Sequence, residues 1–386
     1  LKHDAKLDAR NDVGFTRLHS SAFNESYEIS KFLLEQGADV SVCDMYGCTP
    51  LYFAVSNGQL QMTELLLEHG ANINARSKSR STALQKASSA GFDPVVKLLL
   101  DCKANFQTPN LDAATPLHYA AARGSTSIVK MLLDGGLGVD IVHNFGRTAF
   151  HSAARWGRVR FMAIILAQGA ETNTTAPPGC KAYYKEDNFM VDVTGCTPLI
   201  CASEHGHLDA VKLLLENGVD INASRVDGKN ALSCAVGSGK AEIVEKLLEV
   251  GVEFELSDLA GLKPLAQALK SGKNDIVRLL LKRGTSTNTR DLEGRTALHW
   301  ACLGGFESTA RMLIEHGATV LEDSFGRTPL HYAVYQGSEV LVQMLMDKGV
   351  DPQLKLKDGT SLSSWDKNSS QKTVPSLERT MPEPSP

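Results

Sequence analysis

The sequence has few aromatic residues, little net charge and no long apolar run. Aromatic residues make up 6% of the 386 residues, and the formal net charge is −4. So mild a charge points to no class of partner, and it argues against general nucleic-acid binding, which needs a basic surface. The absence of a run of about 18 apolar residues predicts no membrane span. The first residues, Leu1-Lys2-His3-Asp4, contain no apolar signal-peptide core.

Motifs that carry chemistry are absent as well. The eight cysteines include no Cys-x-x-Cys pair, and the chain has neither a Gly-x-Ser-x-Gly nucleophile motif nor a glycine-rich phosphate loop. We therefore expect no enzyme activity, no cofactor and no metal. The cysteines are expected to be small buried or loop thiols, because cysteine packs as a small apolar residue. Without a disulfide framework the chain fits a reducing compartment, which predicts an intracellular protein, cytoplasmic or nuclear.

One four-residue motif recurs along the chain. Its fullest copies are Thr115-Pro116-Leu117-His118 and Thr328-Pro329-Leu330-His331. Ten copies, called seeds below, begin at residues 16, 49, 82, 115, 148, 197, 230, 263, 296 and 328. They are 33 residues apart, except for a spacing of 49 after residue 148 and of 32 after residue 296. So regular a register indicates stacked copies of one structural unit.

Each unit has the pattern of two helices that end at glycine. The seed threonine can accept bonds from the free N–H groups of a helix start, and proline suits the first helical position. Glycines such as Gly124 and Gly157 suit a left-handed position that ends the first helix. A second helix is predicted from apolar runs such as Val211-Lys212-Leu213-Leu214-Leu215. Because one unit cannot bury its apolar face alone, we expect the units to stack into one elongated core.

A 33-residue period containing Thr-Pro-Leu-His resembles the ankyrin repeat, and the resemblance covers nearly the whole chain. It implies an all-α solenoid of stacked helix-turn-helix repeats, with a short β-hairpin finger before each seed. We assign residues 1–362 to a monomeric array of about ten full repeats with a partial repeat at each end. Residues 363–386 are rich in serine and proline and are predicted to be a disordered tail.

The start of the chain matches the inside of a repeat. Residues 1–10 align without a gap with residues 67–76, where a second helix ends. A terminal repeat normally carries a polar cap, so we interpret the chain as a fragment of a longer protein. The alternative is a natural start with a frayed half repeat.

The spacing of 49 residues exceeds the period of 33 by 16 residues. The additional residues fall in one finger, at about 176–191. Loops tolerate insertions at little cost, so a passive surface loop is one interpretation. The other is an extended finger that presents Tyr183 and Tyr184 to a partner.

Histidine is periodic rather than clustered. It occupies the fourth seed position in five seeds, at His19, His118, His151, His299 and His331. In the ankyrin family this residue hydrogen-bonds within and between neighbouring fingers. The resemblance therefore implies a structural role for these histidines, and not a set of metal ligands.

The resemblance also implies where a partner binds, because ankyrin-family proteins usually bind through finger tips and the exposed end of the first helix. Residues 155–160 form the one local cluster of basic and aromatic side chains, and exposed Trp and Arg are typical of interface hot spots. For each candidate the alternative is packing on a neighbouring finger, or plain solvation. The candidates are Tyr46, Phe145, Arg155, Trp156, Arg158, Tyr183, Tyr184, His205, Phe325 and Tyr335.

Three functions fit the sequence. The first is a protein-interaction scaffold or recognition domain that binds through its fingers and the concave first-helix face. The second is a non-catalytic recognition or regulatory arm of a larger protein whose activity lies upstream. The third, an enzyme or nucleic-acid binder, requires a clustered catalytic pocket or a continuous basic stripe. The sequence supports the first most strongly, with a protein as partner and neither nucleic acid nor membrane.

The helix register makes a prediction about stability. Leu214→Ala truncates a core side chain and should lower the free energy of unfolding by roughly 2–5 kcal/mol. Trp156→Ala, at a solvent-facing position, should leave folding almost intact. Urea unfolding followed by circular dichroism measures both. A loss below about 1 kcal/mol for Leu214→Ala would show that the helix register is misassigned.

Overall fold

The computed structural model describes residues 7–351, except for residues 145, 179–180, 185–188, 193 and 260. The predicted tail lies outside the described residues, as does the start of the partial first repeat. The chain divides into two compact units, Leu1–Ala231 and Leu232–Pro386, and each is described by itself.

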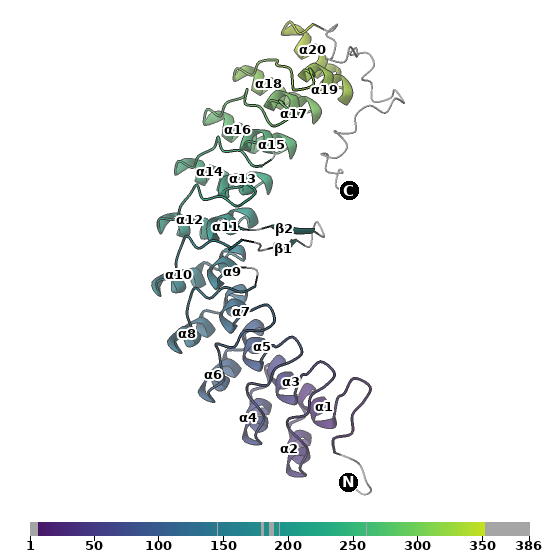
Figure 1. Cartoon of the computed structure of the whole chain (residues 1–386), viewed down its shortest axis with the longest axis vertical. Helices are drawn as coiled ribbons and strands as arrows, with labels where there is room; N and C mark the ends of the chain where they lie inside the picture. Colours follow the sequence, from purple (N-terminus) through teal and green to yellow (C-terminus); the bar gives the residue numbers. More distant parts are fainter. Residues whose placement is uncertain are drawn as a thin grey trace. The chain divides into compact units, whose positions relative to one another are not determined.

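Helices occur in pairs, as the repeat pattern predicts. In the first unit the helices are α1 (Arg17–Phe23), α2 (Tyr27–Glu35), α3 (Pro50–Ser56), α4 (Leu60–Glu68), α5 (Ala83–Ala90), α6 (Asp93–Asp101), α7 (Pro116–Arg123), α8 (Thr126–Asp134), α9 (Ala149–Arg155), α10 (Val159–Ala167), α11 (Pro198–His205) and α12 (Leu208–Glu216). In the second they are α13 (Ala231–Gly237), α14 (Ala241–Glu249), α15 (Pro264–Lys270), α16 (Asn274–Lys282), α17 (Ala297–Leu303), α18 (Glu307–Glu315), α19 (Pro329–Gln336) and α20 (Glu339–Asp347). Within each unit the odd-numbered first helices form one row and the even-numbered second helices another (Figure 1).

The start and end of the first helices follow from their sequence. Thr82 caps α5: its side chain accepts from the backbone N–H of Gln85, whose own side chain accepts from the N–H of Thr82. Gly91 ends the same helix in the left-handed conformation, with φ of 80°, which costs glycine little. These local signals fix where each helix begins and ends, and so fix the register of the repeat.

The core lies between the two rows of helices. Small residues on the first helix, such as Ala120 and Ala121, are fully buried. On the second helix the buried side chains are large, as at Val96, Leu99 and Leu214. Small residues let neighbouring first helices approach closely, and the large ones fill the space behind them, so the all-α solenoid predicted from the sequence is confirmed.

Where the residue at the fourth seed position is histidine or glutamine, it connects successive repeats. The Nδ1 atom of His151 accepts from the N–H of Thr148 at 3.2 Å, so Nε2 carries the proton and donates to the Cys196 carbonyl at 3.0 Å. His19, His118 and His299 make the same contact to the residue before the next seed, at 3.0–3.1 Å. In the third repeat Gln85 replaces histidine and donates from Nε2 to the Ala114 carbonyl at 2.9 Å.

The fingers are mostly turns rather than regular strands. In the second finger Asp44 closes the turn, because its Oδ1 accepts from the N–H groups of Tyr46 and Cys48 at 2.8 and 2.7 Å. Among the described residues, strand pairing outside the insertion is limited to the isolated bridges Arg76–Thr82 and Ser224–Asn230. The residue two positions before each seed is called the turn residue, and it has a positive φ in every described finger. This holds even where the turn residue is Arg80 or Ala113 instead of glycine.

The 49-residue segment between the seeds at residues 148 and 197 contains a two-stranded antiparallel ribbon. Strands β1 (Lys181–Tyr184) and β2 (Phe189–Asp192) pair in the register Lys181 to Asp192. Figure 1 shows the ribbon extending from the side of the first helices, away from the row that contains α10 and α12. At its base Ala176 donates to the Cys196 carbonyl and accepts from Gly195, the same two backbone bonds that Asp44 makes in an ordinary finger. The ribbon is therefore an extension of a finger that keeps the normal finger base.

Buried neutral histidines make the stability of the first unit depend on pH. Burial lowers the pKa of His151 to about 4, against about 6.5 in an unfolded chain. Between these values the unfolded state binds more protons, so stability is lost as the pH falls. The loss is about 1.4 kcal/mol per pH unit for one such group.

We expect His151→Gln to keep the stability of the protein at pH 7, because Gln85 makes both bonds at the equivalent position. It should also weaken the acid destabilisation between pH 6.5 and 4. Thermal melts between about pH 4 and 6.5 measure this change in acid destabilisation. The control is His69→Gln, because His69 is exposed at the C-terminal end of α4. An unchanged pH slope in His151→Gln would contradict the assignment.

Candidate protein-interaction surface

The two residues before each finger's turn residue form its tip, and many of these tips carry large exposed apolar side chains. Leu259 and Leu292 are 72% and 74% exposed, the most exposed large apolar side chains of the described chain. The exposed apolar tip residues are Val13, Met45, Tyr46, Leu111 and Val226 in the first unit, and Leu259, Leu292 and Phe325 in the second. Isolated exposed apolar residues are common, but these recur at one place in the repeat.

The backbone of several tips is bonded to the neighbouring finger. Lys78 donates to the Tyr46 carbonyl at 2.8 Å, and Leu111 donates to the Ser79 carbonyl at 3.1 Å. The same bond joins Asn144 to Asp112 and Ser324 to Glu293. Since the bond uses main-chain groups alone, the tip side chains can vary and project outward while their backbone stays fixed.

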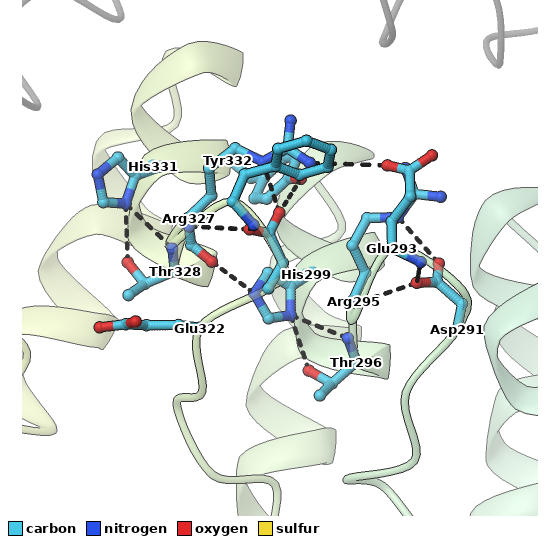
Figure 2. Close-up of polar contacts among 12 residues, drawn as sticks. Asp291, Glu293, Arg295, Thr296, His299, Glu322, Arg327, Thr328, His331 and Tyr332 are labelled. Carbon is cyan, nitrogen blue, oxygen red and sulfur yellow. Dashed lines mark hydrogen bonds and ion pairs between the residues drawn. The ribbon is translucent and has the colours of Figure 1, made fainter. Parts of the chain in front are cut away.

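Buried ion pairs brace the fingers of the second unit (Figure 2). The Asp291 carboxylate accepts from the Arg295 side chain at 2.9 Å and from Trp300 Nε1 at 3.2 Å. One finger later Asp323 pairs with Arg327 and accepts from the Tyr332 hydroxyl at 2.9 Å. Glu293 lies between the two arginines, 3.0 Å from Arg295 and 3.6 Å from Arg327.

Aromatic rings pack against the buried arginines of these two fingers. The Arg295 guanidinium lies 4.2 Å from the centre of the Trp300 ring, and that of Arg327 lies 4.4 Å from the centre of Phe325. Phe325 is half-exposed, so one face of its ring rests on the arginine while the rest remains accessible. Burial raises the pKa of Tyr332 and lowers that of His299 to about 4, so both side chains stay neutral at pH 7.

The candidates from the sequence fall into four groups. Tyr46, Trp156, Arg158 and Phe325 are exposed, as a binding role requires. Arg155, His205 and Tyr335 are half-buried. Tyr183 and Tyr184 lie in β1, where the structure describes backbone and not side chains, and Phe145 lies outside the described residues.

The Arg158 side chain already makes a hydrogen bond within the array. Its Nε donates to the Ala122 carbonyl of the preceding repeat at 3.1 Å. His205 also has internal contacts, because its Nδ1 is 3.0 Å from the Cys201 carbonyl, and burial together with the charge of Arg155 lowers its pKa. Arg158 therefore packs on a neighbouring repeat, which is the alternative to a binding role, whereas the His205 side chain bonds within its own helix.

The residues predicted from the sequence are mainly aromatic and basic, and they do not include the aliphatic tips Leu111, Val226, Leu259 and Leu292. A usable signal was present: all four lie four residues before a seed. Comparing one repeat position along the chain, instead of looking for local clusters, would have found them.

The placement of cysteine and histidine bears on two features, the grouping that a metal site needs and the approach of thiols to one another. Within residues 7–351 and their stated gaps, no group of three or more His, Cys, Asp or Glu side chains is placed to hold a metal. Cys196 and Cys201 are buried with their Sγ atoms 3.3 Å apart, and this thiol contact raises the pKa of Cys196 and lowers that of Cys201. Of the helices described, none has the length and apolar character needed to cross a membrane.

Comparison with known proteins identifies the repeat. A search of curated proteins found no match. A family model described as ankyrin repeats (3 copies) matches overlapping segments at residues 1–77, 18–110, 84–176, 178–258, 223–291 and 265–355. Together these segments cover nearly all of the array, and they contain the seeds, fingers and helix pairs described above. The chain therefore belongs to the ankyrin-repeat family.

Proposed function

We propose that this chain is a protein-interaction scaffold that binds a protein partner through its finger tips and the adjoining ends of its first helices. Ankyrin repeats are generally protein–protein interaction modules and are typically non-catalytic. The observation that carries the proposal is the recurrence of large exposed apolar side chains at one repeat position, from Met45 and Tyr46 to Phe325.

The chemistry of the tips favours a protein over other partners. Exposed Leu, Met, Tyr and Phe side chains supply apolar area, and aromatic residues and Met are enriched in protein interfaces. Main-chain bonds and buried ion pairs hold the tips before binding, which reduces the entropy that association must overcome. The cysteines of the described chain are free thiols, which supports the proposal that this binding takes place inside the cell.

The proposal predicts which variants lose a partner. Met45→Ser with Tyr46→Ser, and separately Leu259→Ser with Leu292→Ser, each remove two exposed apolar side chains from tips. A partner isolated with the wild-type chain should bind at least one of these variants about tenfold more weakly, since central hot-spot residues contribute more than 1 kcal/mol each. Because all four residues are exposed, the melting temperature should change little.

The matched control is Ile29→Ser with Phe32→Ser, which removes two comparably exposed apolar side chains from the second helix α2. Titration of the purified partner by calorimetry compares the three variants with wild type. Equal affinity in both tip variants, or an equal loss in the α2 control, would refute binding through the tips.

A further inference from the structure

A basic pocket opens in the first unit, where α7 ends and α10 begins. Its volume is about 280 Å³, and Arg123, Arg158 and Arg160 line it together with Gly124, Gly157 and Phe161. Phe161 is fully buried, whereas the three arginines are exposed. The pocket thus combines an apolar core residue with cationic side chains that reach solvent.

Among the described residues, no Asp or Glu forms an ion pair with any of the three guanidinium groups. Three buried arginines of the fingers differ, since Arg225, Arg295 and Arg327 each pair with at least one carboxylate. The positive charge of these three side chains is balanced locally, whereas the charge of the pocket arginines is not.

The backbone makes room for the Arg158 side chain at this pocket. Gly124 ends α7 with φ of 85°, and a Cβ there would lie 2.8 Å from the Arg158 Cδ. Glycine thus makes room for the Arg158 side chain to lie across the end of α7. There Nε donates to the Ala122 carbonyl at 3.1 Å, which fixes the guanidinium group and leaves its terminal N–H groups to other acceptors.

The N-terminus of α10 contributes backbone N–H groups to the same pocket. The residue at its N-cap is Arg158, which makes no side-chain bond to the helix and has donors only. The first-turn amides of Arg160 and Phe161 thus receive no acceptor from their cap. Free N–H groups at a helix start favour an anion, and here they adjoin three cations.

We propose that this pocket binds the phosphate group of a phosphorylated serine or threonine on the protein partner. A phosphate carries a charge of about −1.5 to −2 at pH 7 and three acceptor oxygens, which suits several guanidinium groups at once. A carboxylate has one charge and two oxygens, and would leave part of this donor set unused. The partner rests on the proposed function, but the anion site itself does not.

The first test uses inorganic phosphate and needs no partner. Titration at constant ionic strength, against chloride, should shift the backbone NMR signals of Arg160 and Phe161 in a saturable way. Arg123→Gln with Arg160→Gln should weaken this binding at least about tenfold, and Arg160→Gln alone should weaken it measurably. The matched control is Lys97→Gln with Lys130→Gln, which removes the same charge from exposed positions of α6 and α8 and should change affinity less than about twofold.

Absence of a saturable shift, or equal affinity in the arginine double variant, would overturn the site. A second titration compares one peptide with phosphoserine, glutamate or serine at the same position. Tighter binding of the phosphoserine form supports the proposal, and equal binding of the glutamate form overturns the assignment to phosphate. The Met45→Ser, Tyr46→Ser variant should bind phosphate as wild type does, so failure of the finger-tip proposal is distinguishable from failure of this one.

Discussion

Stacking is the constraint on which the repeat array depends, because a repeat buries its apolar face only against its neighbours. Where the fourth seed residue is histidine or glutamine, its hydrogen bond to the next finger fixes the register at which two repeats meet. His151 shows the arrangement: one ring nitrogen accepts inside its own repeat, and the other donates to the Cys196 carbonyl of the next. The insertion is accommodated without loss of this contact, because Ala176 and Gly195 rebuild the normal finger base before Cys196.

Because the finger backbone is held in place, each repeat has some positions that maintain the structure and others whose side chains can vary. Threonine, the fourth seed residue and the turn residues make internal bonds, whereas the exposed apolar side chains of the described tips make none. In the second unit Asp291 and Asp323 hold buried arginines, and Phe325 rests on one of them. An exposed apolar side chain on such a support loses little conformational freedom when a partner covers it. The same scaffold can therefore present different tips at each repeat.

The fold could be predicted from the sequence because its signals are local. A threonine cap, a proline at the first helical position and a glycine at the helix end each act within one turn, and the period repeats them in register. The surface was harder to predict, because exposure depends on neighbouring repeats. Arg158 looked like a free basic residue in the sequence, yet it bonds to Ala122 of the preceding repeat. Leu292 looked unremarkable, yet it is 74% exposed. The closeness of Cys196 and Cys201 arises from the first turn of α11, which spacing alone does not reveal.

Amide hydrogen exchange tests the central claim most directly: that the finger tips are held by their backbone while their side chains face solvent. The account predicts that the amides of Lys78, Leu111 and Ser324, which donate to the preceding finger, exchange slowly, at rates comparable to those of amides inside the adjoining helices. Exchange of these amides at the rate of an unprotected surface loop would contradict it. The fingers would then be mobile loops, and their tips could not act as a preformed binding surface.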